Sequence, residues 1–462
     1  MKELADLSAR ELAARIRRRD VSPVEAVEAA LARIEARREL NAFITVTADQ
    51  ALDAAREAER RVMAGDRLPP LHGVPFAVKD LTLTAGVRTT MGSALYENFV
   101  PQEDAIPVAR AKAAGTILIG KTTTPEFGHK QAASAPIFGQ TLNPIDARFT
   151  CGASSSGAAV AVAAGMGPIG LGTDGGGSVR IPASCCGIVG MKPTLGNVAN
   201  LQPPDLFSAN SYVGPMARDV ADTALLYEAI RGHDARDPFG QAPTPPGRAV
   251  PHTLAGMRVA WLPRAGNRLD PEVESATTAA VRLMEREGAI VEMVELDFVA
   301  LEPHFLVVLE SMLAARVGSQ LERFEARLDP SLVGAVLRGR GHGAVALHEA
   351  GFARTRCFAQ LQALFDRFDL LVSPTLSAPP LPIEQDPNGI VTIDGEAAGT
   401  IRGAWYPYTY PMNLTGHPAL SMPCGKSALG LPIGLQLTGR WHDDRFLLGT
   451  AALVEQLLAG GR

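Results

Sequence analysis

Several features that would place this 462-residue chain in a special class are missing from its sequence. It has five cysteines, of which Cys185 and Cys186 are adjacent, and no paired C-x-x-C motifs, so neither a disulfide framework nor a zinc site with that spacing is indicated. The 44 Lys and Arg residues are fewer than the 49 Asp and Glu residues, and no basic stretch is longer than Arg17-Arg18-Arg19. This charge pattern argues against a nucleic-acid-binding surface.

Long hydrophobic runs are also lacking. The longest apolar-looking segment, residues 157–171, consists mostly of Ala and Gly, and is too short and too weakly hydrophobic to cross a membrane. The first 20 residues are charged and lack the apolar stretch of a signal peptide. We therefore expect a cytoplasmic protein with reduced thiols, no metal or other cofactor and no membrane or nucleic-acid partner.

The residues that are present predict a layered α/β fold. Hydrophobic residues make up 46% of the chain and charged residues 20%, which suits a globular protein with a large core. Two capping boxes, Ser8 with Glu11 and Ser22 with Glu25, predict that residues 8–64 are mainly helical. From Gly73 onward, short β-type runs alternate with Ala-rich helical windows. After a proline-rich stretch at 233–252, we expect strand, helix and strand between 258 and 296.

Two segments have the composition of a catalytic site. Residues 151–157 form a serine cluster that opens a helix of small residues, and residues 172–180 contain three glycines directly before Ser178. Consecutive glycines leave backbone N–H groups unobstructed, so this loop could bind an anion. The phosphate-binding motifs G-x-x-x-x-G-K-[ST] and G-x-G-x-x-G are absent, which disfavours a nucleotide site. A simple tight turn is the alternative.

A serine nucleophile needs a base, and no histidine has a clear claim to that role. Lys79 ends the apolar run Val74–Val78 and is the other candidate. Lowering its pKa from about 10.4 to about 7 would require about 4.6 kcal/mol, which burial and neighbouring groups can supply. The alternative is a surface lysine paired with Asp80.

These segments resemble the amidase signature family. The matching blocks are Gly73-Val-Pro-Phe-Ala-Val-Lys-Asp80, Gly152-Ala-Ser-Ser-Ser-Gly157, Gly172-Thr-Asp-Gly-Gly-Gly-Ser-Val-Arg180 and Gly187-Ile-Val-Gly-Met-Lys-Pro193, in the family's order and spacing. The resemblance covers most of residues 1–230 and 370–458 and is weak between 235 and 370. It implies one amidase domain over 1–462, with N-terminal helices at 1–70, a signature core at 71–230, a variable helical cap at 235–370 and the C-terminal part of the core at 371–462. It also implies a mixed β-sheet covered by helices on both faces.

The resemblance further implies a Ser-cisSer-Lys triad of Ser178, Ser154 and Lys79, in which Lys79 draws a proton through Ser154 from the nucleophile Ser178. The family's oxyanion hole would be formed by the backbone around Gly175, Gly176 and Gly177. Asp174, Arg180 and Ser155 are expected to support the loop, and Met91, Phe127 and Tyr406 to line the substrate pocket. The second block departs from the family's usual Pro-Gly-Gly-Ser-Ser-Gly-Gly by having Cys151, Ala153 and Ser156.

Three functions are compatible with this pattern. The first is a free-standing amidase that hydrolyses a small carboxylic amide to an acid and ammonia or an amine. The second is the glutamine-hydrolysing A subunit of a tRNA-dependent amidotransferase, which places an acidic residue where this chain has Tyr406. The third is a catalytically impaired scaffold, suggested by Ala153 and Ser156. Aliphatic, aryl, urea-like and cyclic amides all remain open as substrates, and a homodimer is the common assembly for such a chain.

Overall fold

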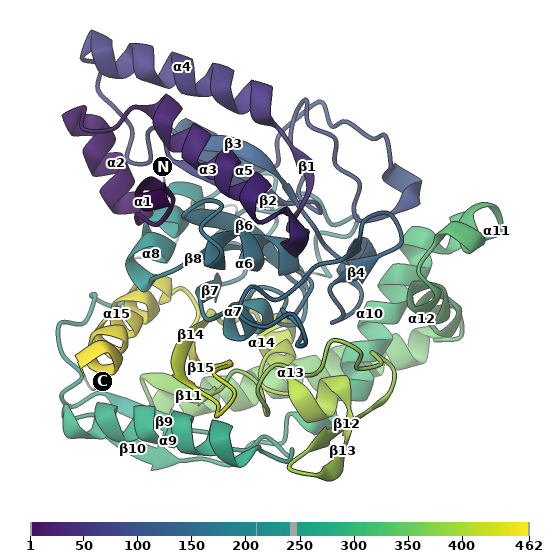
Figure 1. Cartoon of the computed structure of the whole chain (residues 1–462). Helices are drawn as coiled ribbons and strands as arrows, with labels where there is room; N and C mark the ends of the chain where they lie inside the picture. The colour runs from purple at the N-terminus through teal and green to yellow at the C-terminus, as the bar shows by residue number, and fades with distance from the viewer. Residues whose placement is uncertain (1, 209, 241–246, 461–462) are drawn as a thin grey trace.

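A mixed sheet of 11 strands forms the centre of the computed structural model, which describes residues 2–208, 210–240 and 247–460 (Figure 1). Parallel and antiparallel neighbours both occur in it: β2 runs parallel to β3 and β6, whereas β8 runs antiparallel to β6 and β7. In order across the sheet the strands are β1 (Phe43–Val46), β3 (Ile117–Thr122), β2 (Pro75–Lys79), β6 (Ile169–Asp174), β8 (Tyr212–Ala217), β7 (Val189–Lys192), β14 (Ala419–Lys426), β15 (Pro432–Thr438), β11 (Leu370–Pro374), β9 (Arg258–Trp261) and β10 (Ile290–Met293).

Helices cover both faces of this sheet because strand side chains alternate between the faces. In β2, Phe76 and Val78 join the core on one face, while Ala77 faces the opposite side. The first face is covered by α5 (Ile106–Ala113), α8 (Val220–Ile230), α9 (Pro271–Arg286) and α15 (Asp444–Gly460). The second face is covered by α6 (Ser156–Ala163), α7 (Arg180–Cys186), α13 (Ala344–Arg367) and α14 (Tyr410–Thr415). The predicted α/β class, a mixed sheet with helices on both faces, is confirmed.

The N-terminal segment follows the capping signals. Ser8 caps α2 (Ala9–Arg18) and Ser22 caps α3 (Pro23–Ala36), each with a complete capping box. After the short α1 (Lys2–Ala5) and these two helices, α4 (Ala48–Ala64) completes the helical part. The prediction of a mainly helical segment missed β1, which is four residues long and owes its conformation to antiparallel pairing with β3.

Helix α6 sits unusually close to neighbouring backbone, as its small residues predicted. A Cβ atom at Gly157 would lie 2.3 Å from the Ala42 carbonyl oxygen and 2.4 Å from the Thr123 nitrogen, so only glycine fits there. The Gly157 N–H donates to the Thr123 carbonyl at 3.2 Å. This contact fixes the first turn of α6, and with it the serine cluster, against the end of β3.

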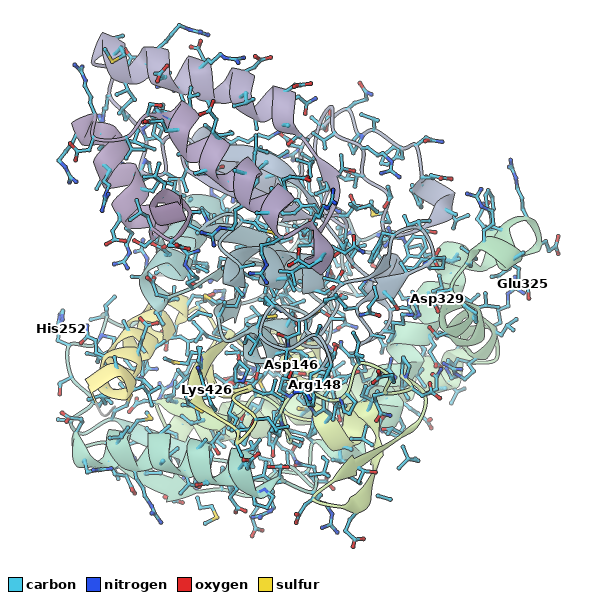
Figure 2. The ribbon with its side chains drawn as sticks, viewed as in Figure 1. Asp146, Arg148, His252, Glu325, Asp329 and Lys426 are labelled. Carbon is cyan, nitrogen blue, oxygen red and sulfur yellow. The ribbon has the colours of Figure 1, made fainter. Side chains whose placement is uncertain are left out.

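The segment expected to be a helical cap is only partly outside the sheet. Within 235–370, β9 and β10 are parallel strands of the sheet and α9 packs on it, so the helical part that leaves the sheet begins after β10; residues 241–246 lie outside the described residues. The cause is local strand–helix–strand periodicity, which makes 258–293 a continuation of the core. The outer part comprises α10 (Glu302–Val317), α11 (Leu321–Phe324) and α12 (Pro330–Arg340). Glu325 marks its projecting tip in Figure 2.

Two small hairpin-like sheets lie outside the main one. They pair β4 (Ser134–Ala135) with β5 (Gly139–Gln140), and β12 (Ile390–Ile393) with β13 (Glu396–Thr400). A helix long and apolar enough to traverse a bilayer does not occur in the described parts of the chain.

Candidate active site

Lys79 lies at the end of β2, beside the end of the parallel strand β6. Because neighbouring parallel strands end at the same edge of a sheet, its side chain meets the end of β6 and the serine cluster that leads into α6. The Nζ atom is 2.8 Å from Ser154 Oγ, 3.0 Å from Ser155 Oγ and 3.3 Å from the Thr173 carbonyl oxygen. The side chain is fully buried.

The three neighbours of Lys79 Nζ differ in whether they can donate a hydrogen bond to it. Ser155 Oγ donates its hydrogen to the Thr173 carbonyl at 3.0 Å and accepts from the Thr173 N–H at 3.2 Å. The Thr173 carbonyl can only accept. A neutral lysine therefore directs its two N–H bonds to Ser155 and Thr173, and its lone pair is left for the hydroxyl hydrogen of Ser154.

The electrostatic surroundings of Lys79 favour this neutral form. Burial lowers the pKa of Lys79 well below its ordinary value, and the charge of Asp174 opposes that shift only in part. The alternative of a surface lysine paired with Asp80 is wrong, because Asp80 faces Lys121 on β3, whose Nζ lies 3.7 Å from Asp80 Oδ1. Lys79 is thus a buried amine with a low proton affinity.

Ser154 and Ser178 come from separate loops that meet beside Lys79. The Ala153–Ser154 peptide bond is cis, and the neighbouring Ser155 N–H donates to the Ser178 carbonyl at 3.1 Å. Across the described residues no hydrogen bond joins the hydroxyls of Ser154 and Ser178. Catalytic hydrogen bonds in ligand-free sites are often long and tighten only when substrate binds.

The glycine loop divides its N–H groups between two uses. The Gly177 N–H donates to Asp174 Oδ1 at 2.6 Å and the Val179 N–H to Asp174 Oδ2 at 3.2 Å. Gly177 was expected in the oxyanion hole, but its N–H is engaged by this carboxylate. Within the described ranges, the N–H groups of Gly175, Gly176 and Ser178 have no acceptor, so they are the donors available to an anion.

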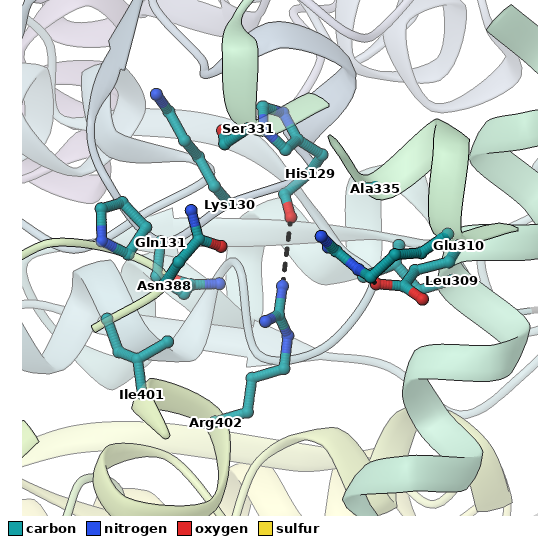
Figure 3. Close-up of a pocket in the computed structure, with 12 residues that line it drawn as sticks. His129, Lys130, Gln131, Leu309, Glu310, Ser331, Ala335, Asn388, Ile401 and Arg402 are labelled. Atoms are coloured by element: carbon teal, nitrogen blue, oxygen red, sulfur yellow. Dashed lines mark hydrogen bonds and ion pairs between the residues drawn. The ribbon is translucent and has the colours of Figure 1, made fainter. Parts of the chain in front are cut away.

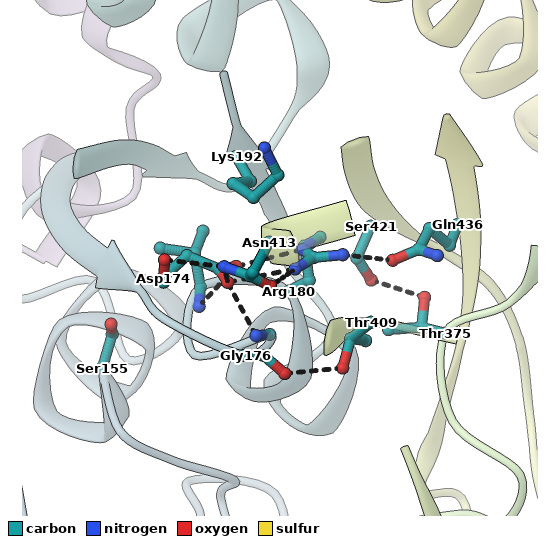
Figure 4. Close-up of polar contacts among 12 residues, drawn as sticks. Ser155, Asp174, Gly176, Arg180, Lys192, Thr375, Thr409, Asn413, Ser421 and Gln436 are labelled. Carbon is teal, nitrogen blue, oxygen red and sulfur yellow. Dashed lines mark hydrogen bonds and ion pairs between the residues drawn. The ribbon is translucent and has the colours of Figure 1, made fainter. Parts of the chain in front are cut away.

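Asp174 and Arg180 form the centre of a buried polar network that holds this loop (Figure 4). Arg180 donates to both carboxylate oxygens of Asp174 at 3.0 Å, to Gln436 Oε1 at 2.8 Å and to Asn413 Oδ1 at 2.8 Å. Although burial disfavours the charged carboxylate, Arg180 holds the pKa of Asp174 below its usual range. The network ties the loop after β6 to β15 and α14.

Residues from distant segments complete the site, and the sequence did not single them out. Thr409 Oγ1 donates to the Gly176 carbonyl at 2.8 Å, and Asn413 Nδ2 donates to the Asp174 carbonyl at 2.8 Å. The ring of Phe305 on α10 covers Gly176, where a Cβ atom would lie 2.8 Å from it. Asn413 opens Asn413-Leu-Thr-Gly-His-Pro418, a further segment whose sequence resembles the family and which was a usable signal, whereas Phe305 lies in the weakly matching segment.

The three residues predicted for the substrate pocket belong to two apolar clusters. Met91 and Phe127 pack with α10 and α12, and Tyr406 packs with Phe305 and Tyr410. Leu309 on α10 touches both clusters. The role of these three residues at the substrate stays a prediction.

A cleft with several polar lining residues is shown in Figure 3. We call it the Arg402 cleft; it lies between residues 129–131, helices α10 and α12, and residues 387–402. Gly128, next to its wall, is so close to the serine cluster that a Cβ atom there would lie 2.9 Å from Ser154 Oγ. Burial lowers the pKa of His129, at the cleft wall, to about 4, so this side chain is neutral at physiological pH. No group of three or more His, Cys, Asp or Glu side chains able to hold a metal ion occurs among the residues described.

Comparison with known proteins gives a consistent set of relatives. The family model described as Amidase matches residues 25–448. The chain is 37% identical to the A subunit of a glutamyl-tRNA(Gln) amidotransferase from Geotalea daltonii, over 98% of each chain, and 34% identical to an acylamidase of Rhodococcus erythropolis, over 97% of this chain and 95% of that protein. A crystal structure of a bacterial aryl acylamidase described as an amidase signature enzyme matches with a TM-score of 0.90 and 27% identity, covering 99% of both chains.

Proposed function

This chain belongs to the amidase signature family, and from that premise we propose that it hydrolyses a small carboxylic amide through an acyl-enzyme on Ser178. The observation that carries the proposal is the contact of 2.8 Å between the buried Lys79 amine and the Ser154 hydroxyl. A lysine in this position can act as a base because burial lowers its pKa and so favours its neutral form.

In the proposed first step, Ser178 Oγ attacks the amide carbonyl carbon. The Ser178 hydrogen passes to Ser154 as the Ser154 hydrogen passes to the Lys79 lone pair. Lys79 thereby becomes positively charged while negative charge develops on the carbonyl oxygen. The N–H groups of Gly175, Gly176 and Ser178 are the available donors for this oxyanion. In acyl-transfer enzymes, the loss of one such donor raises the activation barrier by about 3 to 4 kcal/mol.

The tetrahedral intermediate then loses its nitrogen group. The C–N bond breaks as the leaving nitrogen takes a proton back through Ser154, which yields ammonia or an amine and an ester of Ser178. Water then attacks the ester carbonyl while its proton passes through Ser154 to Lys79. The bond between the carbonyl carbon and Ser178 Oγ breaks as Ser178 takes that proton back, which releases the carboxylic acid and restores the triad. Phe305 covers Gly176 and limits the access of bulk water to this loop.

A free-standing amidase is the form of this activity that we propose first. The similarity to an acylamidase and to an aryl acylamidase structure supports it. Tyr406 supports it as well, because this side chain is buried and carries no charge to bind an ammonium group; burial raises the pKa of Tyr406 to about 12. The five free cysteines agree with the cytoplasm as the proposed compartment.

The second candidate is the glutamine-hydrolysing subunit of a tRNA-dependent amidotransferase. It is supported by the 37% identity with the Geotalea daltonii protein over nearly the full chain. In that case the partners would be the other subunits of the complex and a tRNA. Hydrolysis of glutamine that rises only when such partners are added would favour this candidate.

The test is a screen of ammonia and amine release from aliphatic, aryl, urea-like and cyclic amides and from glutamine, with the purified single chain. We expect release from at least one amide, and a loss of about 1,000-fold or more in Ser178→Ala. Ser156→Ala is the matched control, because Ser156 belongs to the same serine cluster but its buried hydroxyl has no hydrogen-bond partner in the described structure. Equal release by wild type and Ser178→Ala would refute the hydrolase assignment.

The impaired-scaffold alternative is tested by labelling. A fluorophosphonate reacts with an activated serine, so mass spectrometry should find one adduct, on Ser178. An unlabelled Ser178 in the folded protein would favour the scaffold.

A further inference from the structure

Arg402 projects into the Arg402 cleft from the π-helix at 401–405. Figure 3 shows its guanidinium directed into the cleft, between Gln131 and Glu310. Its hydrogen bond to the protein backbone is a long one, from an Nη atom to the His129 carbonyl at 3.5 Å. Its Nε–H is buried and has no partner in the part of the chain that the structure describes.

The other cations of this cleft are already neutralised. Lys130 forms an ion pair with Asp329, and Arg338 forms one with Glu310 at 2.7 Å. Glu310 also contacts His342 Nε2 at 2.9 Å, so both of its carboxylate oxygens already have partners other than Arg402. Glu302, which lies against Gly403 of the π-helix, accepts from Thr400 and forms no ion pair with Arg402 in the described structure. Among the described residues Arg402 makes no ion pair, so it leaves an uncompensated positive charge in the cleft.

An unpaired, partly desolvated guanidinium is costly unless a ligand completes it. Its planar fork of N–H donors matches a carboxylate, which can accept two parallel hydrogen bonds. Gln131 and Asn388, which also line the cleft, carry neutral amides, and the His129 ring is neutral as well, so these groups do not repel an anion. The cleft is therefore suited to a carboxylate.

Two wall segments of the cleft continue along the chain into residues that contact the candidate active site. On one side, Gly128 lies against Ser154 and precedes His129 of the cleft wall. On the other, the π-helix of Arg402 leads to Tyr406 and Thr409, and Thr409 Oγ1 donates to the Gly176 carbonyl.

We propose that Arg402 is a specificity-determining residue that binds a carboxylate of the substrate, so that the preferred substrates are amides carrying a carboxylate beyond the scissile bond. This inference rests on the proposed function. The carboxylate could stand on the acyl side, as in a monoamide of a dicarboxylic acid, or on the amine side, as in an N-acylated amino acid.

Two pairs of substrates distinguish a carboxylate on the acyl side from one on the amine side. On the acyl side, succinamate is compared with its neutral isostere 4-oxopentanamide; on the amine side, 4-acetamidobenzoate is compared with 4-acetamidoacetophenone. The quantity measured is the ratio of kcat/KM for the carboxylate to that for the ketone. In at least one pair we expect wild type to prefer the carboxylate, Arg402→Gln to lower the ratio by about 10- to 100-fold, and Arg402→Lys to lower it less.

Arg338→Gln is the matched control, because it removes the same charge from the same cleft at a residue already paired with Glu310. We expect it to change the ratio by less than about threefold. An equal fall of this ratio in Arg338→Gln and Arg402→Gln would overturn the proposal, since the ratio would then depend on the total positive charge of the cleft and not on binding by Arg402. An unchanged ratio in Arg402→Gln in both pairs would overturn it as well.

Failure of the proposed function has a different signature. If wild type hydrolyses none of the four amides, calorimetry with Ser178→Ala measures the binding of succinamate and 4-acetamidobenzoate directly. Weaker binding of at least one when Arg402→Gln is added would support the carboxylate site and count against hydrolysis of these amides. Binding that is absent, or unaffected by Arg402→Gln, would overturn the carboxylate site.

Discussion

At the residue scale, two buried lysines on adjacent strands differ in their partners: one forms an ion pair, and among the described residues the other contacts only neutral groups. Lys121 is paired with Asp80, and burial lowers its pKa to about 8 against the attraction of that carboxylate. Lys79 has hydroxyl and carbonyl neighbours, and Asp174 is the carboxylate whose charge acts on it. The carboxylate of Asp174 is itself engaged by Arg180. A lysine without an ion pair of its own is suited to being a neutral base.

The two lysines should therefore respond differently to the same substitution. Lys79→Met should lower kcat/KM by about 100- to 10,000-fold, the usual contribution of a general base. Lys121→Met should leave Asp80 buried without its cation and lower the free energy of unfolding by about 3 to 5 kcal/mol. Kinetics together with urea denaturation, for both variants, measure this contrast. Comparable activity loss per folded molecule in the two variants would contradict it.

The same argument fixes the sign of the pH dependence. Only the neutral amine of Lys79 has a lone pair, so kcat/KM should fall as the pH decreases through the pKa of Lys79. Because burial lowers that pKa well below the ordinary lysine value, the active range should extend well below about pH 10. A pH profile of kcat/KM on a substrate that does not titrate checks this. An activity that rises only near the ordinary lysine pKa would be contrary to the proposed environment.

At the scale of elements, the position of α6 depends on a glycine, Gly157. Gly157 lets the helix meet the backbone of residues 42 and 123, and so places Ser154 and Ser155 against Lys79. Gly170 on β6 also faces α6, but a Cβ atom there would lie 3.5 Å or more from its neighbours, an ordinary contact distance. The two glycines are therefore a matched pair for testing close packing.

Gly157→Ala should be much more destabilising than Gly170→Ala. The first substitution forces Cβ against backbone atoms that cannot rotate away, and we expect a loss of about 3 kcal/mol or more in the free energy of unfolding. The second should change that free energy by less than about 1 kcal/mol. Denaturation midpoints of both variants provide the measurement, and similar losses would show that α6 is not held by this contact.

At the scale of the whole molecule, one sheet unites segments from nearly the full chain. Strand β9 lies between β11 and β10, so the strand–helix–strand segment from 258 to 293 shares the sheet with the strands that carry the site. The largest apolar cluster likewise combines residues from Ala9 to Val454. The division into a core and a separate cap over 235–370 therefore does not follow the packing.

This continuity predicts a single unfolding transition. A variant with Trp405→Phe and Trp441→Phe retains Trp261 on β9 as its one tryptophan, since the chain has three. The midpoint of its fluorescence change in urea should coincide with that of its far-ultraviolet circular dichroism. A fluorescence transition at clearly lower urea would mean that the β9 region unfolds before the rest of the chain.

The sequence by itself determined the features that depend on neighbours along the chain. The capping boxes of α2 and α3, the small-residue helix α6 and the strand–helix–strand at 258–293 all follow from local periodicity and local hydrogen bonds. Ser178, Ser154 and Lys79 were named as a triad because the short motifs that contain them resemble those of the amidase signature family. Strands β1, β8 and β14 were not predicted, because their conformation depends on pairing with partners elsewhere in the chain.

Only the tertiary structure decided how the site is completed. In the folded chain the Gly177 N–H donates to Asp174, and Phe305 covers Gly176. Arg402 faces a cleft in which Lys130 and Arg338 form ion pairs with other residues. Most of these contacts join segments far apart in the chain, and the first depends on the exact path of a loop. Hydrogen-bond partners and charge compensation are properties of distance in space, and spacing along a chain does not encode them.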